Sequence, residues 1–334
     1  MKEGSIIVPL PEHDGDVCKS MDVFYNPVMK HHRDVTVSVV KALQPTRIGL
    51  PLSGSGIRAV RIMKECGYTP EIYVNDKRSN FMDIVHEICD VNECELPIIH
   101  NMDANVFMQS VKHFDYLDLD PFGTPAPFMQ AAISSMRNGG ILAITATDTA
   151  ALTGTYPTVA RRKYWAKNIR TNHMHETGLR ILIRFCQLHG ASLERALIPV
   201  MSYSKDHYYR VFFKVKYGKK AVDALLDQHH YAQYHNHRLT ISKYNYGDGQ
   251  FLGPMYTGKL QDKEFLNSLD NEWAQKLEHE LDTFGGVDVY AVCSTLHKNV
   301  PPYKILLQHG TRTHFSERVI KGDIEKIMWE LSHS

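Results

Sequence analysis

The sequence predicts an α/β protein with a Rossmann-like, doubly wound parallel sheet, followed by a smaller C-terminal α+β domain. Between residues 47 and 145, apolar segments of strand length alternate with helical segments, which is typical of a parallel sheet covered by helices. A glycine-rich turn directly follows the first of these strands. After Asp148 the alternation stops, and beyond residue 217 the chain is richer in Tyr, His and Gly. We therefore expect two domains, 1–217 and 218–334.

Each element is predicted from its own pattern. Strands are expected at 47–52, 71–74, 97–100, 114–119 and 141–145, and helices at 57–66, 79–92 and 127–136. Residues 34–44 fit either a helix or a strand. A basic helical region at about 158–188 and strands around 196–202 and 208–215 complete the first domain. In the second domain we expect helices at 263–283 and 323–331.

The composition indicates a globular protein and excludes some classes. Of the 334 residues, 43% are hydrophobic and 22% are charged, which suffices for a sizeable core. Because there is no run of 18 apolar residues and no secretory signal, we expect no membrane association. None of the six cysteines forms a C-x-x-C pair, so we expect reduced thiols in the cytoplasm. A net charge of +1 says nothing about a polyanionic partner, and no obligate protein partner is evident.

The most informative segment is Asp120-Pro121-Phe122-Gly123, at the end of the predicted strand 114–119. In open α/β sheets, ligands bind at the carboxyl ends of strands. The Asp120 carboxylate and the Pro121 carbonyl can each accept a hydrogen bond from an amine, and Phe122 can stack on a planar base. This set suits the exocyclic amine of a nucleobase. The alternative is a rigid Pro/Gly turn after a buried strand.

A second segment predicts a cofactor site. Gly54-Ser55-Gly56-Ile57-Arg58-Ala59 fits G-x-G-x-x-A between a strand and a helix, where glycines let the backbone approach a ligand closely. Asp76 follows 22 residues after Gly54, in the place of a carboxylate that holds ribose hydroxyls. NAD and S-adenosylmethionine sites share this pattern, and a simple turn with Asp76 as a helix cap is the alternative. The Asp120 segment favours an amine methyltransferase, because a nicotinamide enzyme has no need of it.

With these segments in place, the chain resembles the tRNA (guanine-26-N2)-dimethyltransferases from about Met21 to Lys321. The matching segments, in chain order, are Val23-Phe24-Tyr25-Asn26-Pro27, Arg33-Asp34, Ser53 to Arg61, Asp120 to Pro125, Thr147-Asp148, Arg170-Thr171, His175-Glu176, Gly178 to Leu182, Gly253-Pro254, Gly258-Lys259-Leu260 and Arg312 to Ser316. The resemblance implies a class I methyltransferase domain, S-adenosyl-L-methionine as the methyl donor and a guanine N2 amine in tRNA as the acceptor.

The resemblance also implies roles for single residues. Asp120 carries over as the catalytic residue, with Pro121 and Phe122 beside it. Cofactor contacts carry over to Arg33, Gly54, Gly56, Arg58, Asp76, Asp103 and Ala104. Arg33 or Arg58 could pair with the methionyl carboxylate of the cofactor, Asp76 suits its ribose, and Asp103-Ala104 suits its adenine.

Two departures from the family pattern concern His32 and residues 218–252. His32 stands where the family usually has Asn. Many members carry four cysteines in a small zinc module, whereas residues 218–252 contain no cysteine and instead carry His229, His230, His235 and His237. Because structural zinc sites normally use thiolates, we expect no metal and a solvated or aromatic-packed segment.

Basic residues gather in one segment of this nearly neutral chain. Residues 161–184 contain seven Lys and Arg and only one acid, Glu176. Such a face suits the phosphates of an RNA, although an ordinary solvated helix is the alternative. We expect RNA contacts at Arg161, Arg162, Lys163, Lys167 and Arg170, and more weakly at Arg312 and Lys321. We expect His175-Glu176 to be structural. The rival functions are methylation of DNA or protein and a non-catalytic RNA-binding module.

Overall fold

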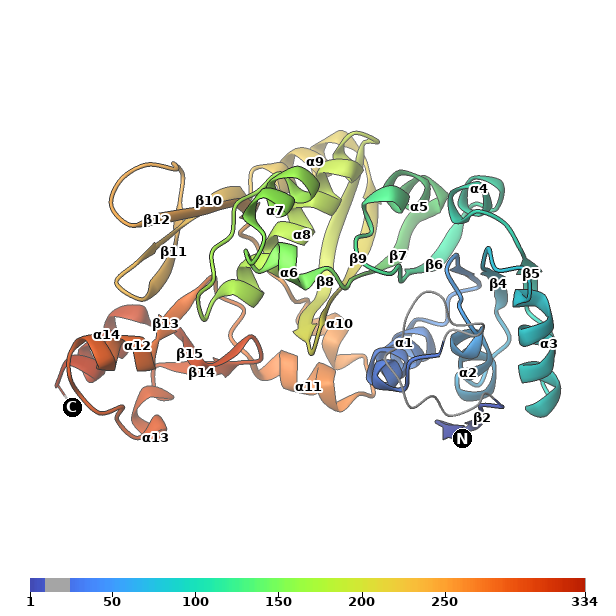
Figure 1. The fold of residues 1–334 in the computed structure, drawn as a ribbon, viewed down its shortest axis with the longest axis horizontal. Coiled ribbons are helices and arrows are strands. Elements are labelled where there is room, and N and C mark those ends of the chain that lie inside the picture. Colours follow the sequence, from blue (N-terminus) through green and yellow to red (C-terminus); the bar gives the residue numbers. More distant parts are fainter. Residues whose placement is uncertain (10–24, 334) are drawn as a thin grey trace.

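The computed structural model describes residues 1–9 and 25–333. Figure 1 shows the N-terminal half and the sheet of the C-terminal part at opposite ends of an elongated molecule. Val23 and Phe24 of the predicted N-terminal segment lie outside the described residues. Within the described ranges, no helix is long and apolar enough to cross a membrane.

The first part of the chain forms a seven-stranded sheet in the order β5-β4-β3-β6-β7-β9-β8. The strands are β3 Arg47–Leu50, β4 Glu71–Asn75, β5 Ile98–His100, β6 Phe114–Leu119, β7 Met136–Ala146, β8 Arg195–Lys205 and β9 Tyr208–Tyr217. The α/β, Rossmann-like prediction is confirmed, and the five strands expected between residues 47 and 145, β3 to β7, pair in parallel. β9 is antiparallel to both β7 and β8, because a short turn at Asp206 joins β8 and β9 as a hairpin.

Two layers of helices enclose this sheet. The helices are α1 Lys30–Leu43, α2 Ile57–Glu65, α3 Phe81–Val91, α4 Ala104–Ser110, α5 Met129–Ser135, α6 Thr149–Leu152, α7 Pro157–Tyr164 and α8 Met174–Ala191, with short 3-10 turns at Pro27–Met29 and Ala126–Phe128. Side chains alternate between the two faces: Ile141 and Ala143 of β7 pack with the core of α1–α3, and Leu142 and Ile144 with that of α4, α5 and α8.

Two helix predictions are settled by packing and capping. Residues 34–43 belong to α1, which ends before Gln44, and Val35 and Val39, four residues apart, are both fully buried. The prediction of a single helix at 263–283 was wrong. Two short helices occupy this region, α10 Lys263–Asn267 and α11 Glu272–His279. The Asn271 side chain accepts hydrogen bonds from the backbone of Trp273 and Ala274, which starts a new helix there.

The second part of the chain forms an antiparallel sheet in the order β12-β10-β11-β13-β15-β14. Its strands are β10 His229–His235, β11 Arg238–Ser242, β12 Gln250–Tyr256, β13 Gly286–Asp288, β14 Gly310–Thr313 and β15 Ser316–Gly322; its remaining helices are α9 Lys219–Leu226, α12 Val289–Thr295, α13 Tyr303–Leu306 and α14 Ile324–His333. Two further short strands, β1 Lys2–Glu3 and β2 Ile6–Ile7, pair with each other. The division at residue 217 stays a prediction, since apolar residues from beyond it share both large cores.

A buried ion cluster joins the two parts. Glu176 of α8 lies 2.9 Å from Arg180 Nε and 2.9 Å from Lys321 Nζ of β15, and its carboxylate also accepts the backbone N–H of Gly285. Glu176, Arg180 and Lys321 are each at most 2% exposed. Lys321 therefore holds the parts together, and its predicted contact with RNA is corrected. Burial would raise the pKa of Glu176, but Lys321 and Arg180 lower it to about 2.

We expect Lys321→Met to destabilise the protein by about 3–5 kcal/mol at about pH 7, because Glu176 would lose a buried partner. In the wild type, the contribution of Glu176 is fully present above its unfolded pKa, about 4.3, and is lost as the pH falls towards its folded pKa of about 2. Urea unfolding over this pH range measures both effects. Lys326→Met, at an exposed pair with Asp323, is the control. If Lys321→Met kept wild-type stability but bound tRNA more weakly, the predicted contact of Lys321 with RNA would be supported instead.

Candidate active site

The predicted cofactor loop is held open by two left-handed glycines. Gly54 and Gly56 have φ angles of +60° and +79°, and α2 begins at the next residue. A Cβ on Gly56 would lie 2.9 Å from Val85 Cγ2, so a side chain there would meet both strain and a neighbour. The backbone N–H of Gly54 donates to Asp76 Oδ2 at 2.9 Å. The loop after β3 and the carboxylate after β4 therefore form one unit at the carboxyl edge of the sheet.

Asn75 ties the neighbouring strand ends to this unit. Its fully buried side-chain amide donates to Pro51 O and Met102 O, and its Oδ1 accepts from the backbone of Met102. Asp103 follows and caps α4, accepting from the backbone of Asn105 and Val106, while remaining exposed. Asn75 was not predicted from the sequence, because a single polar residue at a strand end carries no distinguishing pattern.

The geometry of these residues fits S-adenosyl-L-methionine. A glycine cradle opens at a helix N-terminus, and the carboxylates of Asp76 and Asp103 follow at the next two strand ends, with Ala104 buried behind them. Arg33 lies apart from them: its Nε donates to Glu3 Oε1 at 2.7 Å, and the side chain is 9% exposed. The structure thus brings together Gly54, Gly56, Asp76, Asp103 and Ala104, and places Arg33 in a separate ion pair.

Asp120, at the end of β6, is held by Arg58. Arg58 Nη2 lies 2.6 Å from Asp120 Oδ2 and 3.0 Å from His32 Nδ1, which must accept this bond. Burial would raise the pKa of Asp120, but the positive charge of Arg58 lowers it, so the carboxylate is ionised at neutral pH. Burial lowers the pKa of His32 well below its usual value. Arg58 thus contacts Asp120, the residue predicted to hold the methyl-accepting amine, and does not serve only the predicted cofactor loop.

Two further charged residues lie behind Asp120. Asp118 Oδ1 forms an ion pair with Arg58 Nη1 at 2.5 Å, and Asp118 accepts hydrogen bonds from both terminal nitrogens of Arg210 at 2.8 and 2.6 Å. Burial would raise the pKa of Asp118, yet the two arginines hold it well below its usual range. The alternation of Asp118 and Asp120 in β6 could have revealed the first residue. Arg210, 90 positions beyond Asp120, gave no signal.

The rest of the Asp120-Pro121-Phe122-Gly123 segment is fixed to the end of β7. The Gly123 N–H donates to Thr147 Oγ1 at 2.7 Å, and the Thr147 N–H donates to Gly123 O at 2.9 Å. Gly123 has a φ of +83°, which lets the chain turn there. Phe122 is 39% exposed. A planar ligand at this edge can therefore reach its ring.

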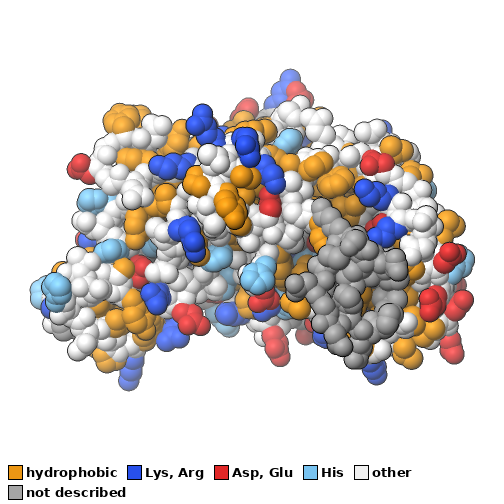
Figure 2. Space-filling model, in the orientation of Figure 1, with side chains coloured by type: hydrophobic (Ala, Val, Ile, Leu, Met, Phe, Trp, Pro, Cys, Tyr) orange, Lys and Arg blue, Asp and Glu red, His pale blue; other side chains and the backbone are white. Residues whose placement is uncertain are grey.

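The basic segment is connected to the same loop. The Tyr164 hydroxyl lies 2.6 Å from Asp148 Oδ1 and 2.9 Å from Thr124 Oγ1. The cations of this segment that are exposed are Arg161, Arg162, Lys163, Lys167 and Arg170. Figure 2 shows Lys and Arg side chains gathered over the area that α6–α8 occupy in Figure 1. Arg312 is also exposed, and its guanidinium lies over the Tyr303 ring, 4.3 Å from the centroid.

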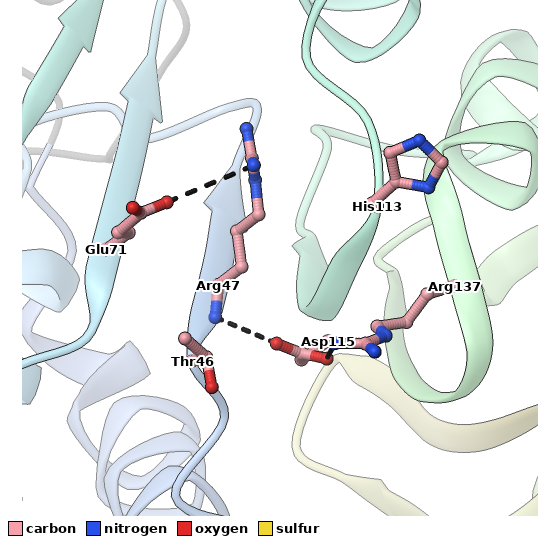
Figure 3. Close-up of a pocket in the computed structure, with 6 residues that line it drawn as sticks. All are labelled: Thr46, Arg47, Glu71, His113, Asp115 and Arg137. Atoms are coloured by element: carbon pink, nitrogen blue, oxygen red, sulfur yellow. Dashed lines mark hydrogen bonds and ion pairs between the residues drawn. The ribbon is translucent and has the colours of Figure 1, made fainter.

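One surface hollow lies at the opposite, amino edge of the sheet (Figure 3). There Asp115 accepts from the backbone of Arg47 at 3.0 Å and from Arg137 Nη1 at 2.8 Å. Arg47 Nη1 lies 4.0 Å from Glu71. These charges satisfy one another, and ligands of open α/β sheets bind at the other edge. We therefore assign no catalytic role to this hollow.

Three of the four histidines near β10 contact separate partners. His229 contacts Gln187, His230 contacts Thr257 and His237 contacts Thr295. Over residues 1–9 and 25–333, no group of three or more His, Cys, Asp or Glu side chains is placed to hold a metal ion. The absence of a metal remains a prediction.

A mixed seven-stranded sheet with a glycine cradle after β3 and an Asp-Pro-Phe-Gly turn after β6 defines a class I methyltransferase that acts on an amine. Comparison with known proteins then identifies the family. Residues 4–331 match the family described as N2,N2-dimethylguanosine tRNA methyltransferase, and the chain belongs to it. It is accordingly an S-adenosyl-L-methionine-dependent tRNA methyltransferase acting on guanine N2.

Individual relatives agree with this family over nearly their whole length. The chain is 36% identical to the tRNA (guanine(26)-N(2)/guanine(27)-N(2))-dimethyltransferase of Aquifex aeolicus, with 94% of this chain and 90% of that protein covered. It is 34% identical to the tRNA (guanine(26)-N(2))-dimethyltransferase of Thermococcus kodakarensis, covering 97% and 95%. The structure of Trm1 from Pyrococcus horikoshii with S-adenosyl-L-methionine matches with a TM-score of 0.86 and 28% identity, covering 99% and 98%.

We expect Asp76→Ala to weaken S-adenosyl-L-methionine binding by about 1.5–3 kcal/mol, because a hydrogen bond to a charged group is lost and the Gly54 loop is released. Affinity for tRNA should stay unchanged. Titration calorimetry with cofactor and filter binding with tRNA measure the two effects. Asp115→Ala, at the opposite edge of the sheet, is the control. Unchanged cofactor affinity in Asp76→Ala would move the ribose contact to another residue.

Proposed function

We propose that this protein transfers one or two methyl groups to the N2 amine of guanine 26 in tRNA, with Asp120 and Pro121 as the residues that hold the amine. One observation supports these roles most directly. Asp120 Oδ2 is occupied by Arg58, whereas Asp120 Oδ1 and the Pro121 carbonyl accept no hydrogen bond from the described part of the chain. Two acceptors therefore remain at one strand end for the two protons of an amine.

The two acceptors determine where the amine lone pair points. When Asp120 Oδ1 and Pro121 O each accept one N–H, the nitrogen is fixed and its lone pair is directed away from them, towards the cofactor side. S-adenosyl-L-methionine, when bound, supplies a methyl group activated by a sulfonium. The amine nitrogen forms the new bond as the carbon–sulfur bond breaks, so positioning contributes much of the rate enhancement. The ring of Phe122 stacks on the guanine, which must leave its helical stack to reach this edge.

The proton balance follows from the charge of Asp120. The methylated nitrogen carries a positive charge until it releases one of its protons. Because the pKa of Asp120 is lowered, its carboxylate is a weak base and serves first as a hydrogen-bond acceptor. A cationic aromatic amine is a strong acid, so a weak base or water suffices to take the proton. A second methylation repeats the cycle with the single N–H that remains.

The cofactor and the tRNA approach from different elements. Gly54, Gly56, Asp76, Asp103 and Ala104 are proposed to hold the cofactor along the ends of β3–β5. Of the two candidates Arg33 and Arg58, Arg33 is the proposed partner of its carboxylate, after exchange of its ion pair with Glu3, because Arg58 stays paired with Asp118 and Asp120. The tRNA backbone is proposed to lie on the exposed cations Arg161, Arg162, Lys163, Lys167 and Arg170, with Arg312 as a further contact. The described cysteines are all unpaired, which supports a reducing compartment such as the cytoplasm.

We expect Asp120→Asn to abolish methyl transfer while leaving both cofactor and tRNA affinity close to wild type. The amide keeps the size of the side chain but loses the charge that holds Arg58 and the amine. Mass spectrometry of nucleosides from treated tRNA measures N2-methylguanosine and N2,N2-dimethylguanosine, and binding is measured separately. Asp115→Asn is the control. Near wild-type turnover in Asp120→Asn would refute the assigned role.

We expect charge reversal at Arg161, Arg162 and Lys163 to weaken tRNA binding and to flatten its dependence on salt. Each lost phosphate contact should lower the slope of log affinity against log salt by somewhat under about one unit. Binding isotherms at several salt concentrations provide the slope. Charge reversal at Lys216, Lys219 and Lys220, exposed near the opposite edge, is the matched control. An unchanged slope in the first variant would place the tRNA on another face.

A further inference from the structure

Two buried residues, Asp118 and Arg210, support Asp120 from behind. Asp118 precedes Asp120 by two positions on β6, and Arg210 approaches from β9. We infer that Asp118 and Arg210 are positioning residues for methyl transfer, which act through Arg58 to fix the oxygen of Asp120 that accepts the target amine. This inference rests on the proposed function and adds a specific role for residues that touch neither substrate nor cofactor.

Arg210 anchors the carboxylate of Asp118. Both terminal nitrogens of Arg210 donate to Asp118, Nη1 to Oδ1 at 2.8 Å and Nη2 to Oδ2 at 2.6 Å, and both side chains are fully buried. The hydroxyls of Tyr116 and Thr36 lie 2.9 and 3.1 Å from Asp118 Oδ2. A bidentate pair with these additional bonds leaves the carboxylate no freedom to rotate.

Asp118, held in this way, fixes the position of the Arg58 guanidinium. Asp118 Oδ1 also forms an ion pair with Arg58 Nη1 at 2.5 Å, so Asp118 lies between two guanidinium groups. Arg58 Nη2 then reaches Asp120 Oδ2 at 2.6 Å and His32 Nδ1 at 3.0 Å. Because the guanidinium is planar, fixing its Nη1 on Asp118 determines where its Nη2 can hold Asp120.

The third step is the balance of charge. Two arginines face two aspartates, and His32 adds no charge, because its Nδ1 accepts from Arg58 while its Nε2 contacts Thr145 Oγ1 at 2.8 Å. Arg210 Nη1 donates to the same Thr145 oxygen at 2.8 Å. Removal of Arg210 would leave Asp118 to draw Arg58 inward and away from Asp120. Asp120 could then present either oxygen to the amine, and a displacement of about 1 Å can cost about 10²-fold in rate.

The test compares Arg210→Met and Arg210→Lys with the wild type, using methyl transfer to tRNA under saturating conditions. We expect Arg210→Met to lose about 10²-fold in kcat, with tRNA affinity unchanged. The control is Glu176→Gln, which breaks the other buried ion cluster and should lower stability while leaving kcat close to wild type. If Arg210→Met does not fold, Arg210→Lys replaces it in the test. The lysine retains the charge but loses the bidentate geometry, so kcat should still be lower than in the wild type.

The pH profile distinguishes positioning from a merely structural role. The charged and titratable groups near Asp120 are Arg58 of α2, His32 of α1, Asp118 of β6 and, across Asp118, Arg210 of β9. Loss of the Arg210 cation should raise the pKa of Asp120. The acid limb of the pH profile of kcat should then move to higher pH. Loss of the Asp118 anion, in Asp118→Asn, should move it to lower pH. Arg210→Lys should leave it in place.

Opposite shifts in the two variants, with an unshifted Arg210→Lys, would support the inference. Full kcat in Arg210→Met, or parallel losses without any shift of the acid limb, would overturn it. The outcome is separable from that of the proposed function. If the wild type forms no N2-methylated guanosine, the function fails; if the wild type is active and Asp120→Asn is not, while Arg210→Met matches the wild type, only the positioning role fails.

Discussion

The candidate active site depends on packing two carboxylates and two guanidinium groups together without leaving any of these charges unpaired; Asp118 and Arg210 are fully buried, and Asp120 and Arg58 are partly exposed. Isolated in an apolar interior, each charge would be very unfavourable, and the four are tolerated only because each one meets an opposite charge at hydrogen-bonding distance. The cluster draws on α2, β6 and β9, with His32 of α1 beside it. The same contacts that allow these charges to be buried also fix their positions, so the stability of the strand ends and the geometry of the site have one origin.

Around this cluster the sheet separates two tasks. The ends of β3, β4 and β5 carry the glycine cradle and the carboxylates of Asp76 and Asp103, whereas the ends of β6 and β7 carry the turn that is proposed to hold the acceptor amine. Arg58 belongs to the first set by its place in the chain and to the second by its contacts. Tyr164 adds a link from the basic segment to the turn. An RNA lying on α7 would therefore touch a helix that is hydrogen-bonded to Thr124, directly after the Asp120-Pro121-Phe122-Gly123 segment.

The sequence predicted the parts of this arrangement that are local in the chain. Apolar runs, glycines and strand-end carboxylates are short patterns, and they located Gly54, Asp76 and Asp120 on their elements. Contacts between distant segments were not predictable, because no periodicity pairs Arg210 with Asp118. The same limit explains Lys321, which was predicted to contact RNA and instead pairs with Glu176 in the interior. The predicted helix at 263–283 was wrong for a local reason, since the helix-starting role of Asn271 was overlooked.

The packing of α10 and α11 has a consequence for how the chain folds during synthesis. Leu266, Leu269, Ala274 and Leu277 belong to the same apolar core as Val35 and Val39 of α1. The surface of the N-terminal sheet on this side is therefore closed by residues made long after its last strand, β9, has been completed. Until they leave the ribosome, the nascent chain exposes an apolar face beside the future active site. Maturation of the enzyme is thus timed by its C-terminal half, and a chain ending at residue 217 would expose a surface prone to aggregation.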